Sequence, residues 1–267
     1  MARAIRNVLR LFLLAAVLAL TAAAAAANNL IDTKWRMRPL SLAVASDRLA
    51  GVEISGMPLP PAEDYDIPLA DPAAAVAKIK DALGRVLAAS PVAAAGIARL
   101  ARHGTPRIVY DAMFPEEQIS RVVIAAFLIA EYTPQRGRRD FTMMIGRFGA
   151  NWPADELAAV LVHELVGHGI QRLDNRFGRD RPIDLECEAR LWQEMYYIDS
   201  RAKLDTQEMV AFRTTTNRRV CNDFRRHLAR SAAAALRAWD GGRPDMKHLL
   251  DLFPAYYDAQ RAAGRRK

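Results

Sequence analysis

The spacing of hydrophobic residues changes several times along the chain, and each change predicts a different kind of element. After an apolar leader, residues 28–70 contain only two short apolar alternations, at 40–44 and 52–54, followed by a proline-rich stretch. This pattern predicts one or two strands and then a loop that runs over the surface. Residues 28–70 could alternatively act as a propeptide.

Helical spacing begins at residue 72. Between 72 and 102 the sequence is rich in alanine, and its larger apolar residues recur every three or four positions, which predicts helix. Pro91 lies inside this stretch. Because proline interrupts the interior of a helix, we expect two helices there.

Three runs rich in β-branched and aromatic residues follow, at 107–114, 121–133 and 140–148. Turn-like segments separate them, so they predict three strands of a small sheet with antiparallel pairs. The second run also contains several alanines, and a helix is the alternative there. The strand at 141–148, within the third run, is the expected edge strand, along which an extended peptide substrate could add its backbone.

The second half of the chain predicts helices. Pro153 marks a helix start, because proline is favoured in the first turn, and Asp155 and Glu156 suit the positive end of the helix dipole. This helix should run to about Leu173. Further helices are predicted after a glycine-containing loop, at 184–201, 205–239 and 245–263.

Residues 28–267 are therefore expected to form a single α+β domain. We expect a small, mostly antiparallel sheet packed on one long helix, followed by a helical C-terminal half. The chain is 51% hydrophobic and 25% charged, which is sufficient apolar material for one substantial core.

Residues 1–27 have the layout of a secretory signal peptide. Arginines precede an uncharged apolar run, and small alanines at 25–27 suit cleavage. We therefore expect export to a periplasm or to the cell exterior. The alternative is an uncleaved membrane anchor, because residues 11–27 carry no charge. No later segment is long and apolar enough to cross a bilayer.

The formal net charge is +8, and three of the positive charges belong to the leader. A mildly basic mature chain favours peripheral association with an anionic envelope surface. Nucleic acid is not an expected partner, since an exported protein rarely meets any and the sequence contains no stacking or helix-turn-helix signature. One basic set is expected to form a solvated helix face: Arg218, Arg219, Arg225, Arg226 and Arg230.

The chain has two cysteines, Cys187 and Cys221. In an oxidising compartment they could form one disulfide. Two buried thiols are the alternative.

The clearest chemical signal is the hexapeptide HELVGH, at 163–168. Zinc peptidases commonly carry H-E-x-x-H on a helix, with histidines four positions apart, whereas His163 and His168 are five apart. In a regular α-helix, positions i and i+5 lie about 140° apart, so the two rings would diverge. A single π-turn absorbs one extra residue and returns both rings to one face, and Gly167 tolerates that distortion.

If the turn is widened in this way, the residue types fit a zinc site. Neutral imidazoles are good zinc ligands, and Glu164 follows the first histidine directly, where a carboxylate can act as general base on a water molecule. The alternative is a solvated helix end with incidental histidines.

A catalytic zinc site needs a third protein ligand. The next predicted helix offers Glu186, with Glu188 as the competitor. On a helix, the face of Glu186 continues through Ala189, Arg190, Gln193 and Tyr197. We choose Glu186 because the small Ala189 on its face would let two helices approach closely.

These residues resemble a known family. The motif H-E-x-x-G-H, followed on another helix by E-C-x-A, looks like that of the dipeptidyl peptidase III family of zinc exopeptidases, with Glu186 on the zinc-ligand glutamate. That family is larger and two-lobed, and Leu185 and Arg190 here replace its flanking glutamates. What the resemblance implies is the broader gluzincin pattern of two histidines and a glutamate in a zincin-like domain. Thermolysin-like enzymes carry an acid where this chain has Arg190.

Three further residues are weaker candidates. Tyr197 and His227 could each donate a hydrogen bond to a developing oxyanion. Asp174 could orient His168, and an acid in the loop after the helix is an equally natural interpretation.

Together these features predict an exported metallopeptidase. It would hold one Zn2+ through His163, His168 and Glu186 and hydrolyse peptide or protein substrates with Glu164 as the base. The alternatives are a catalytically inactive zinc-binding or peptide-binding envelope protein, and an envelope scaffold without metal. The sequence pattern specifies no oligomeric state.

Overall fold

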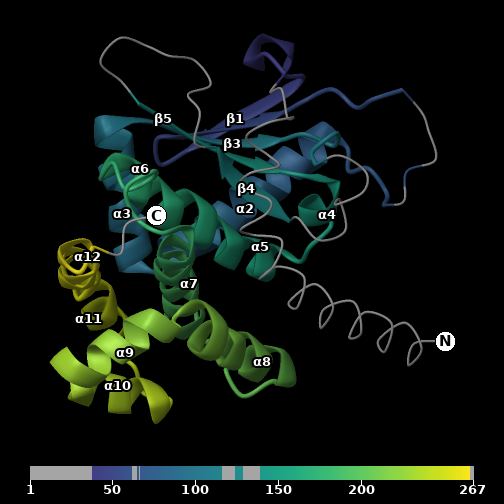
Figure 1. Cartoon of the computed structure of the whole chain (residues 1–267). Helices are drawn as coiled ribbons and strands as arrows, with labels where there is room; N and C mark the ends of the chain where they lie inside the picture. Colours follow the sequence, from purple (N-terminus) through teal and green to yellow (C-terminus); the bar gives the residue numbers. More distant parts are fainter. Residues whose placement is uncertain (1–37, 62–64, 66, 116–123, 129–138, 265–267) are drawn as a thin grey trace.

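The computed structural model describes residues 38–61, 65, 67–115, 124–128 and 139–264. The leader at 1–27 lies outside these residues. The described chain has the expected α+β class, with a five-stranded sheet at one end and helices beneath and beyond it (Figure 1).

The sheet is mixed, in the order β1-β2-β3-β5-β4. Its strands are β1 (Ala45–Leu49), β2 (Val52–Gly56), β3 (Gly104–Tyr110), β4 (Ala125–Leu128) and β5 (Arg139–Ile145). The two outer pairs, β1 with β2 and β4 with β5, are antiparallel. The central pairs, β2 with β3 and β3 with β5, are parallel, so the expectation of a mostly antiparallel sheet was wrong at the centre. The chain leaves β2 through two helices before β3, which is the kind of crossover that parallel strands require.

The strand expected at the edge is also placed differently. β5 corresponds to the predicted run at 140–148, but it lies between β3 and β4. β4, from the middle of the predicted run at 121–133, is the edge strand on this side. Most of that run lies outside the described residues.

Helices α2 (Pro72–Ala89) and α3 (Pro91–His103) confirm the expected break at Pro91. Asp71 caps α2 by accepting from the backbone N–H groups of Ala73 and Ala74. Ser90 ends α2 and caps α3. Both helices pack against the sheet, where their buried residues belong to the main hydrophobic core.

One long helical segment runs beneath the sheet. It consists of α5 (Ala154–Leu161), the π-helical η3 (Val162–His168) and α6 (Gly169–Leu173), which follow one another without a gap. The short α4 (Arg147–Ala150) precedes it. η3 contacts β4, β5 and α3, and its most extensive helical neighbour is α7 (Pro182–Asp199).

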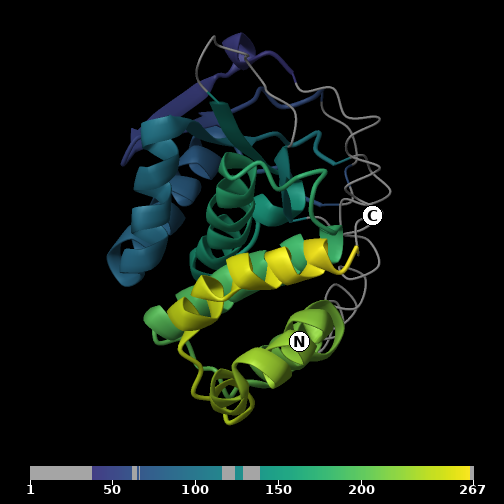
Figure 2. The same cartoon turned by 60° about the vertical axis from the view of Figure 1, so that its left-hand side comes forward.

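The C-terminal part is helical, as expected. Its elements are α8 (Gln207–Thr215), η4 (Thr216–Val220), α9 (Asn222–Ser231), α10 (Ala233–Asp240), α11 (Met246–Asp251) and α12 (Phe253–Ala262). In Figure 2 the yellow α12 lies between α9–α10 and the helices beneath the sheet. A disulfide joins Cys187 of α7 to Cys221, just before α9, so the paired alternative for the cysteines is the one observed.

No single helix in the described part of the chain is both long and apolar enough to span a bilayer. Only α2 and α3 taken together, with a bend of 116° between them, satisfy the length and composition test.

Candidate metal centre

The helical turn that carries HELVGH is widened as the spacing of its histidines predicts. η3 is a π-helix over Val162–His168, with α-helix on either side. The ring centroids of His163 and His168 lie 5.0 Å apart, with the ring planes at 87°. The extra residue is therefore absorbed locally, and the two buried imidazoles converge instead of diverging.

Glu186 completes the cluster from the second turn of α7. One carboxylate oxygen lies 3.5 Å from His163 Nε2, and the other lies 3.4 Å from His168 Nε2. The three candidate ligand atoms all lie within 4.8 Å of one another. Two imidazole nitrogens and one carboxylate oxygen are a donor set that zinc accepts, and this spacing fits a single cation among them.

Close contact between η3 and α7 makes this convergence geometrically feasible. A Cβ atom on Gly167 would lie only 2.9 Å from both Cα and Cβ of Ala189. The absence of a side chain at Gly167 and the small side chain at Ala189 therefore allow the backbones to approach. This agrees with the expected role of Ala189 on the face of Glu186.

Glu164 lies beside the cluster without belonging to it. Its two carboxylate oxygens are 3.9 Å from His163 Nε2 and 4.0 Å from His168 Nε2. The backbone N–H of Phe127 in β4 donates to Glu164 Oε2 at 2.9 Å. The edge strand of the sheet therefore fixes the carboxylate that the sequence proposes as the base.

Burial and mutual charge shift the pKa values of these four groups in different directions. Burial lowers the pKa of His163 to about 4, with the nearby positive charge of Arg190 acting in the same sense. Burial also acts to lower the pKa of His168, but contacts with Glu186, Glu164 and Gln171 together outweigh it and raise that pKa to about 9. The two histidines and the carboxylate thus form one coupled charge system.

The two carboxylates differ for the same reasons. Burial raises the pKa of Glu164 to about 7. Burial would also raise the pKa of Glu186, but its contacts with the two histidines hold it well below its usual range. Of the two carboxylates at the site, Glu164 is therefore the one whose proton affinity suits acid–base exchange near neutral pH.

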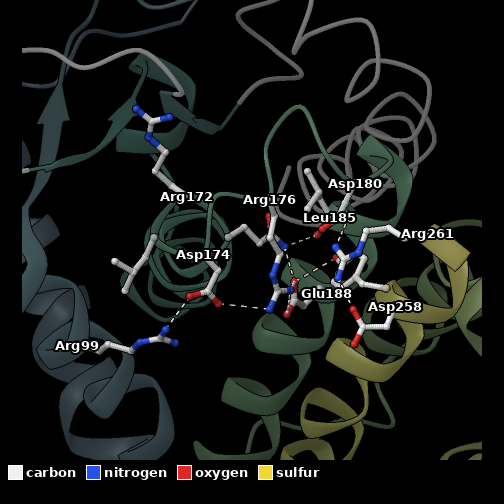
Figure 3. Close-up of polar contacts among 12 residues, drawn as sticks. Arg99, Arg172, Asp174, Arg176, Asp180, Leu185, Glu188, Asp258 and Arg261 are labelled. Carbon is white, nitrogen blue, oxygen red and sulfur yellow. Dashed lines mark hydrogen bonds and ion pairs between the residues drawn. The ribbon is translucent and has the colours of Figure 1, made fainter. Parts of the chain in front are cut away.

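His168 is oriented by a residue that the sequence reasoning missed. His168 Nδ1 lies 2.8 Å from Gln171 Oε1, and the Gln171 amide nitrogen donates to Leu185 O and to Glu188. The expected partner, Asp174, instead forms ion pairs with Arg99 at 2.7 Å and Arg176 at 3.4 Å (Figure 3). Of the two interpretations of Asp174, the loop acid is the one observed, because its position after α6 directs its side chain to these arginines.

Glu188, the competitor for third ligand, does not join the cluster. It is buried and ion-paired with Arg176 at 2.7 Å, as Figure 3 shows. The hydroxyl of Tyr257 in α12 also donates to it at 3.3 Å. The choice of Glu186 over Glu188 therefore agrees with the helical geometry.

The two candidate oxyanion donors are engaged elsewhere. The Tyr197 hydroxyl donates to Glu156 at 2.9 Å, and the His227 ring packs against Tyr256 with centroids 5.4 Å apart. Within the described residues, neither side chain forms a hydrogen bond or ring contact with the histidine–glutamate cluster. Of the predicted basic face, Arg225 is ion-paired with Asp240 and Arg226 with Asp223.

Arg190 is a second neighbour of the site whose role sequence reasoning missed. It lies one turn after Glu186 on the same face of α7, and its charge lowers the pKa of both His163 and Glu164. Its guanidinium donates to Gln193 at 3.1 Å and lies over the Phe212 ring at 5.7 Å. Its location four positions after the expected ligand was visible in the sequence.

The comparisons with known proteins identify no relative. No family model matches the chain, and no curated protein and no solved structure is significantly similar to it.

Proposed function

We propose that this protein is a zinc-dependent peptidase of the gluzincin type, built on a zincin-like domain that spans residues 28–267. One observation carries the proposal. A π-helical turn brings His163 and His168 together with Glu186 from a neighbouring helix, so that their ligand atoms lie within 4.8 Å of one another.

His163, His168 and Glu186 would hold one Zn2+. When bound, a zinc ion supplies the Lewis acidity that makes a water molecule a nucleophile near neutral pH. Two observations support these ligands. Both imidazoles present Nε2 toward Glu186, and the hydrogen bond between His168 Nδ1 and Gln171 leaves Nε2 of His168 free to coordinate.

Glu164 would be the general base. It lies next to the ligand cluster, its pKa is raised to about 7, and the Phe127 N–H fixes its position. Near neutral pH a carboxylate with this pKa can accept a proton from water and then donate it to the departing amine of the cleaved peptide bond. The substrate would be a peptide or protein.

The edge strand β4 supports a peptide substrate in particular. Among the described residues β4 is the outer strand next to β5, and its Phe127 N–H donates to Glu164, so this edge borders the proposed base. An extended peptide that adds along β4 would bring its backbone to the cluster.

We also propose that the mature protein is exported after removal of residues 1–27. The disulfide between Cys187 and Cys221 supports this, since such bonds persist in oxidising compartments. Peripheral association with an anionic envelope surface remains part of the proposal, and nucleic acid is not an expected partner.

A catalytically inactive zinc-binding or peptide-binding envelope protein is the second candidate. The observation that favours it is the engagement of Tyr197 with Glu156 and of His227 with Tyr256, which leaves neither of them at the cluster.

The test combines metal content with peptidase activity. We expect about one zinc per chain in the wild type and in Glu164→Gln, and at least a ~10²-fold loss of activity in Glu164→Gln, because only the base is removed. His163→Ala should lose the metal. Asp155→Asn, an exposed acid on α5, serves as the control and should keep both properties.

Three outcomes separate the candidates. Activity that survives in Glu164→Gln contradicts the assignment of the base. Stoichiometric zinc without activity on a broad peptide mixture favours the binding protein. Failure of the wild type to bind zinc refutes the metal centre.

A further inference from the structure

We propose that Gln171 is a positioning residue for the metal centre. It hydrogen-bonds both to the ring of His168 and to a buried ion-pair network, and so holds the ring in a fixed orientation. The inference rests on the metal-binding part of the proposed function and does not require hydrolysis. Gln171 lies on α6, three positions after His168, and its side chain is fully buried.

The hydrogen bonds of Gln171 fix which way its amide points. Its Nε2 donates to Leu185 O at 2.8 Å and to Glu188 Oε2 at 3.0 Å. Both of these partners accept only, so the amide nitrogen must face them. The Gln171 oxygen then faces His168 Nδ1 at 2.8 Å and accepts its proton. When His168 is neutral, as a zinc ligand must be, this contact holds it in the tautomer with the proton on Nδ1. Its Nε2, which faces Glu186, then has a free lone pair for the metal.

The same amide also ties the two candidate ligands to each other. Leu185, whose carbonyl accepts from Gln171, directly precedes Glu186 in α7. Gln171 therefore connects the ring of His168 with the turn of α7 that carries the third ligand. A change at Gln171 alters the relative position of both ligands and leaves their identities unchanged.

Glu188, the other partner of the Gln171 amide, is itself held in place by several contacts. Glu188 accepts two hydrogen bonds from Arg176 Nη1, at 2.8 and 2.7 Å, and one from the Tyr257 hydroxyl at 3.3 Å. Arg176 is held in turn by Asp174, which pairs with Arg99 of α3, so the network extends across the loop between α6 and α7 (Figure 3). Arg176 thus compensates the negative charge of Glu188. Glu188 orients the neutral amide of Gln171, which in turn orients His168.

Metal-ligating histidines usually donate their second ring N–H to an acceptor that fixes the ring, and removal of that acceptor typically costs 10- to 100-fold in metal affinity. In this chain the acceptor is an amide whose own orientation depends on Glu188. We therefore expect zinc affinity to depend on the pair Gln171 and Glu188, although neither would touch the ion.

The experiment measures zinc affinity of the full chain by competition with a chelator of known affinity. Gln171→Met keeps the length of the side chain but removes the acceptor, and it should bind zinc about 10- to 100-fold more weakly than the wild type. The double variant Gln171→Glu with Glu188→Gln keeps the net charge and places an acceptor on His168 again. It should bind at least about tenfold more tightly than Gln171→Met, by restoring that acceptor.

Gln260→Met on α12 is the matched control, since it makes the same substitution away from the cluster. Thermal unfolding in chelator reports any general loss of stability. If Gln171→Met unfolds at a lower temperature but binds zinc within about threefold of the wild type, Gln171 is only structural and the inference is wrong. The inference also fails if the double variant shows no recovery. If the wild type itself binds no zinc, the metal centre and this inference fail together.

Discussion

His163 and His168 have the same side chain and lie in the same helical turn, yet their pKa values shift in opposite directions. Both are buried, which disfavours the charged imidazolium. Arg190 adds a positive neighbour to His163, whereas Glu186, Glu164 and Gln171 all favour the charged form of His168. At neutral pH the metal-free cluster should therefore hold His168 as the charged imidazolium and His163 as the neutral imidazole.

This difference predicts a pH dependence of zinc binding. A histidine must be neutral to bind zinc, and the pKa of His168 is raised to about 9, so zinc must displace its proton at any lower pH. Zinc affinity should rise by up to about tenfold per pH unit between pH 7 and 9 and level off above that. His163, with a pKa of about 4, should not contribute in this range.

Calorimetry in buffers of different ionisation enthalpy measures the protons released. Glu164→Gln is the appropriate background, because Glu164 titrates near pH 7 and would otherwise add to the signal. We expect about one proton per zinc at pH 7.5. Release of no proton would contradict the assignment of the charged histidine.

The identities of the cluster residues could be predicted from the sequence, but most of their supports could not. His163, His168 and Glu186 belong to short motifs whose spacing has a geometric meaning. Gln171 lies three positions after His168, so the helical spacing could have suggested that contact. Its bonds to Leu185 and Glu188 and the Phe127 N–H act across the fold, and no local pattern marks them. Asp174 was the candidate that the sequence offered for orienting His168, and its ion pairs with Arg99 and Arg176 explain why it points elsewhere.

At the level of elements, counting residues along a helix was more informative than identifying strand pairs. The five-residue spacing of the histidines implied one extra residue in a turn, and η3 is such a turn. Strand direction depends on how the chain crosses between strands. β3 and β5 are buried on almost every position, which is typical of parallel strands covered on both faces. Polar residues such as Arg107 and Asp140 interrupt both strands, so the sequence did not show this burial as a continuous apolar run.

The contact between η3 and α7 gives a prediction at Gly167. In Gly167→Ala the new methyl group would lie 2.9 Å from Ala189, so η3 and α7 must separate. Overpacking of this kind typically costs about 1–3 kcal/mol of folding stability. Because the two helices carry different ligands, zinc affinity should fall as well.

Gly84→Ala is the control for the helix propensity of alanine. Gly84 lies in α2, and its added methyl would come no closer than 4.0 Å to Leu49. This variant should be up to about 1 kcal/mol more stable than the wild type, because alanine favours helix over glycine. Chemical unfolding and zinc competition of both variants separate the effects. Normal zinc binding by Gly167→Ala would mean that close contact of η3 and α7 is not needed for the site.

At the scale of the whole molecule, the cluster lies at the junction of two parts of the chain. His163 and His168 lie in η3, and the Phe127 N–H of β4 in the sheet holds Glu164. Glu186 lies in α7, which packs against the C-terminal helices. α12 reaches the start of α7 through Tyr256, which bonds to Asp184, and through Arg261, which pairs with Asp180. The C-terminal helices therefore help to hold the ligand helix in place.

The disulfide should contribute to the stability of the fold, because it links α7 to the chain just before α9. Cys187 and Cys221 are 34 residues apart, and a loop of that length limits the unfolded chain enough to stabilise the fold by about 3–4 kcal/mol. Replacing both cysteines with alanine should lower the free energy of unfolding by about that amount. Zinc affinity should change much less, since contacts at Gly167 and Gln171 still join η3 and α6 to α7. Urea unfolding with and without reductant measures the first effect, and reductant should no longer act on the double variant. If the double variant instead loses zinc and keeps its stability, the bond serves mainly to position Glu186, and the C-terminal helices would matter more for the site than for the fold.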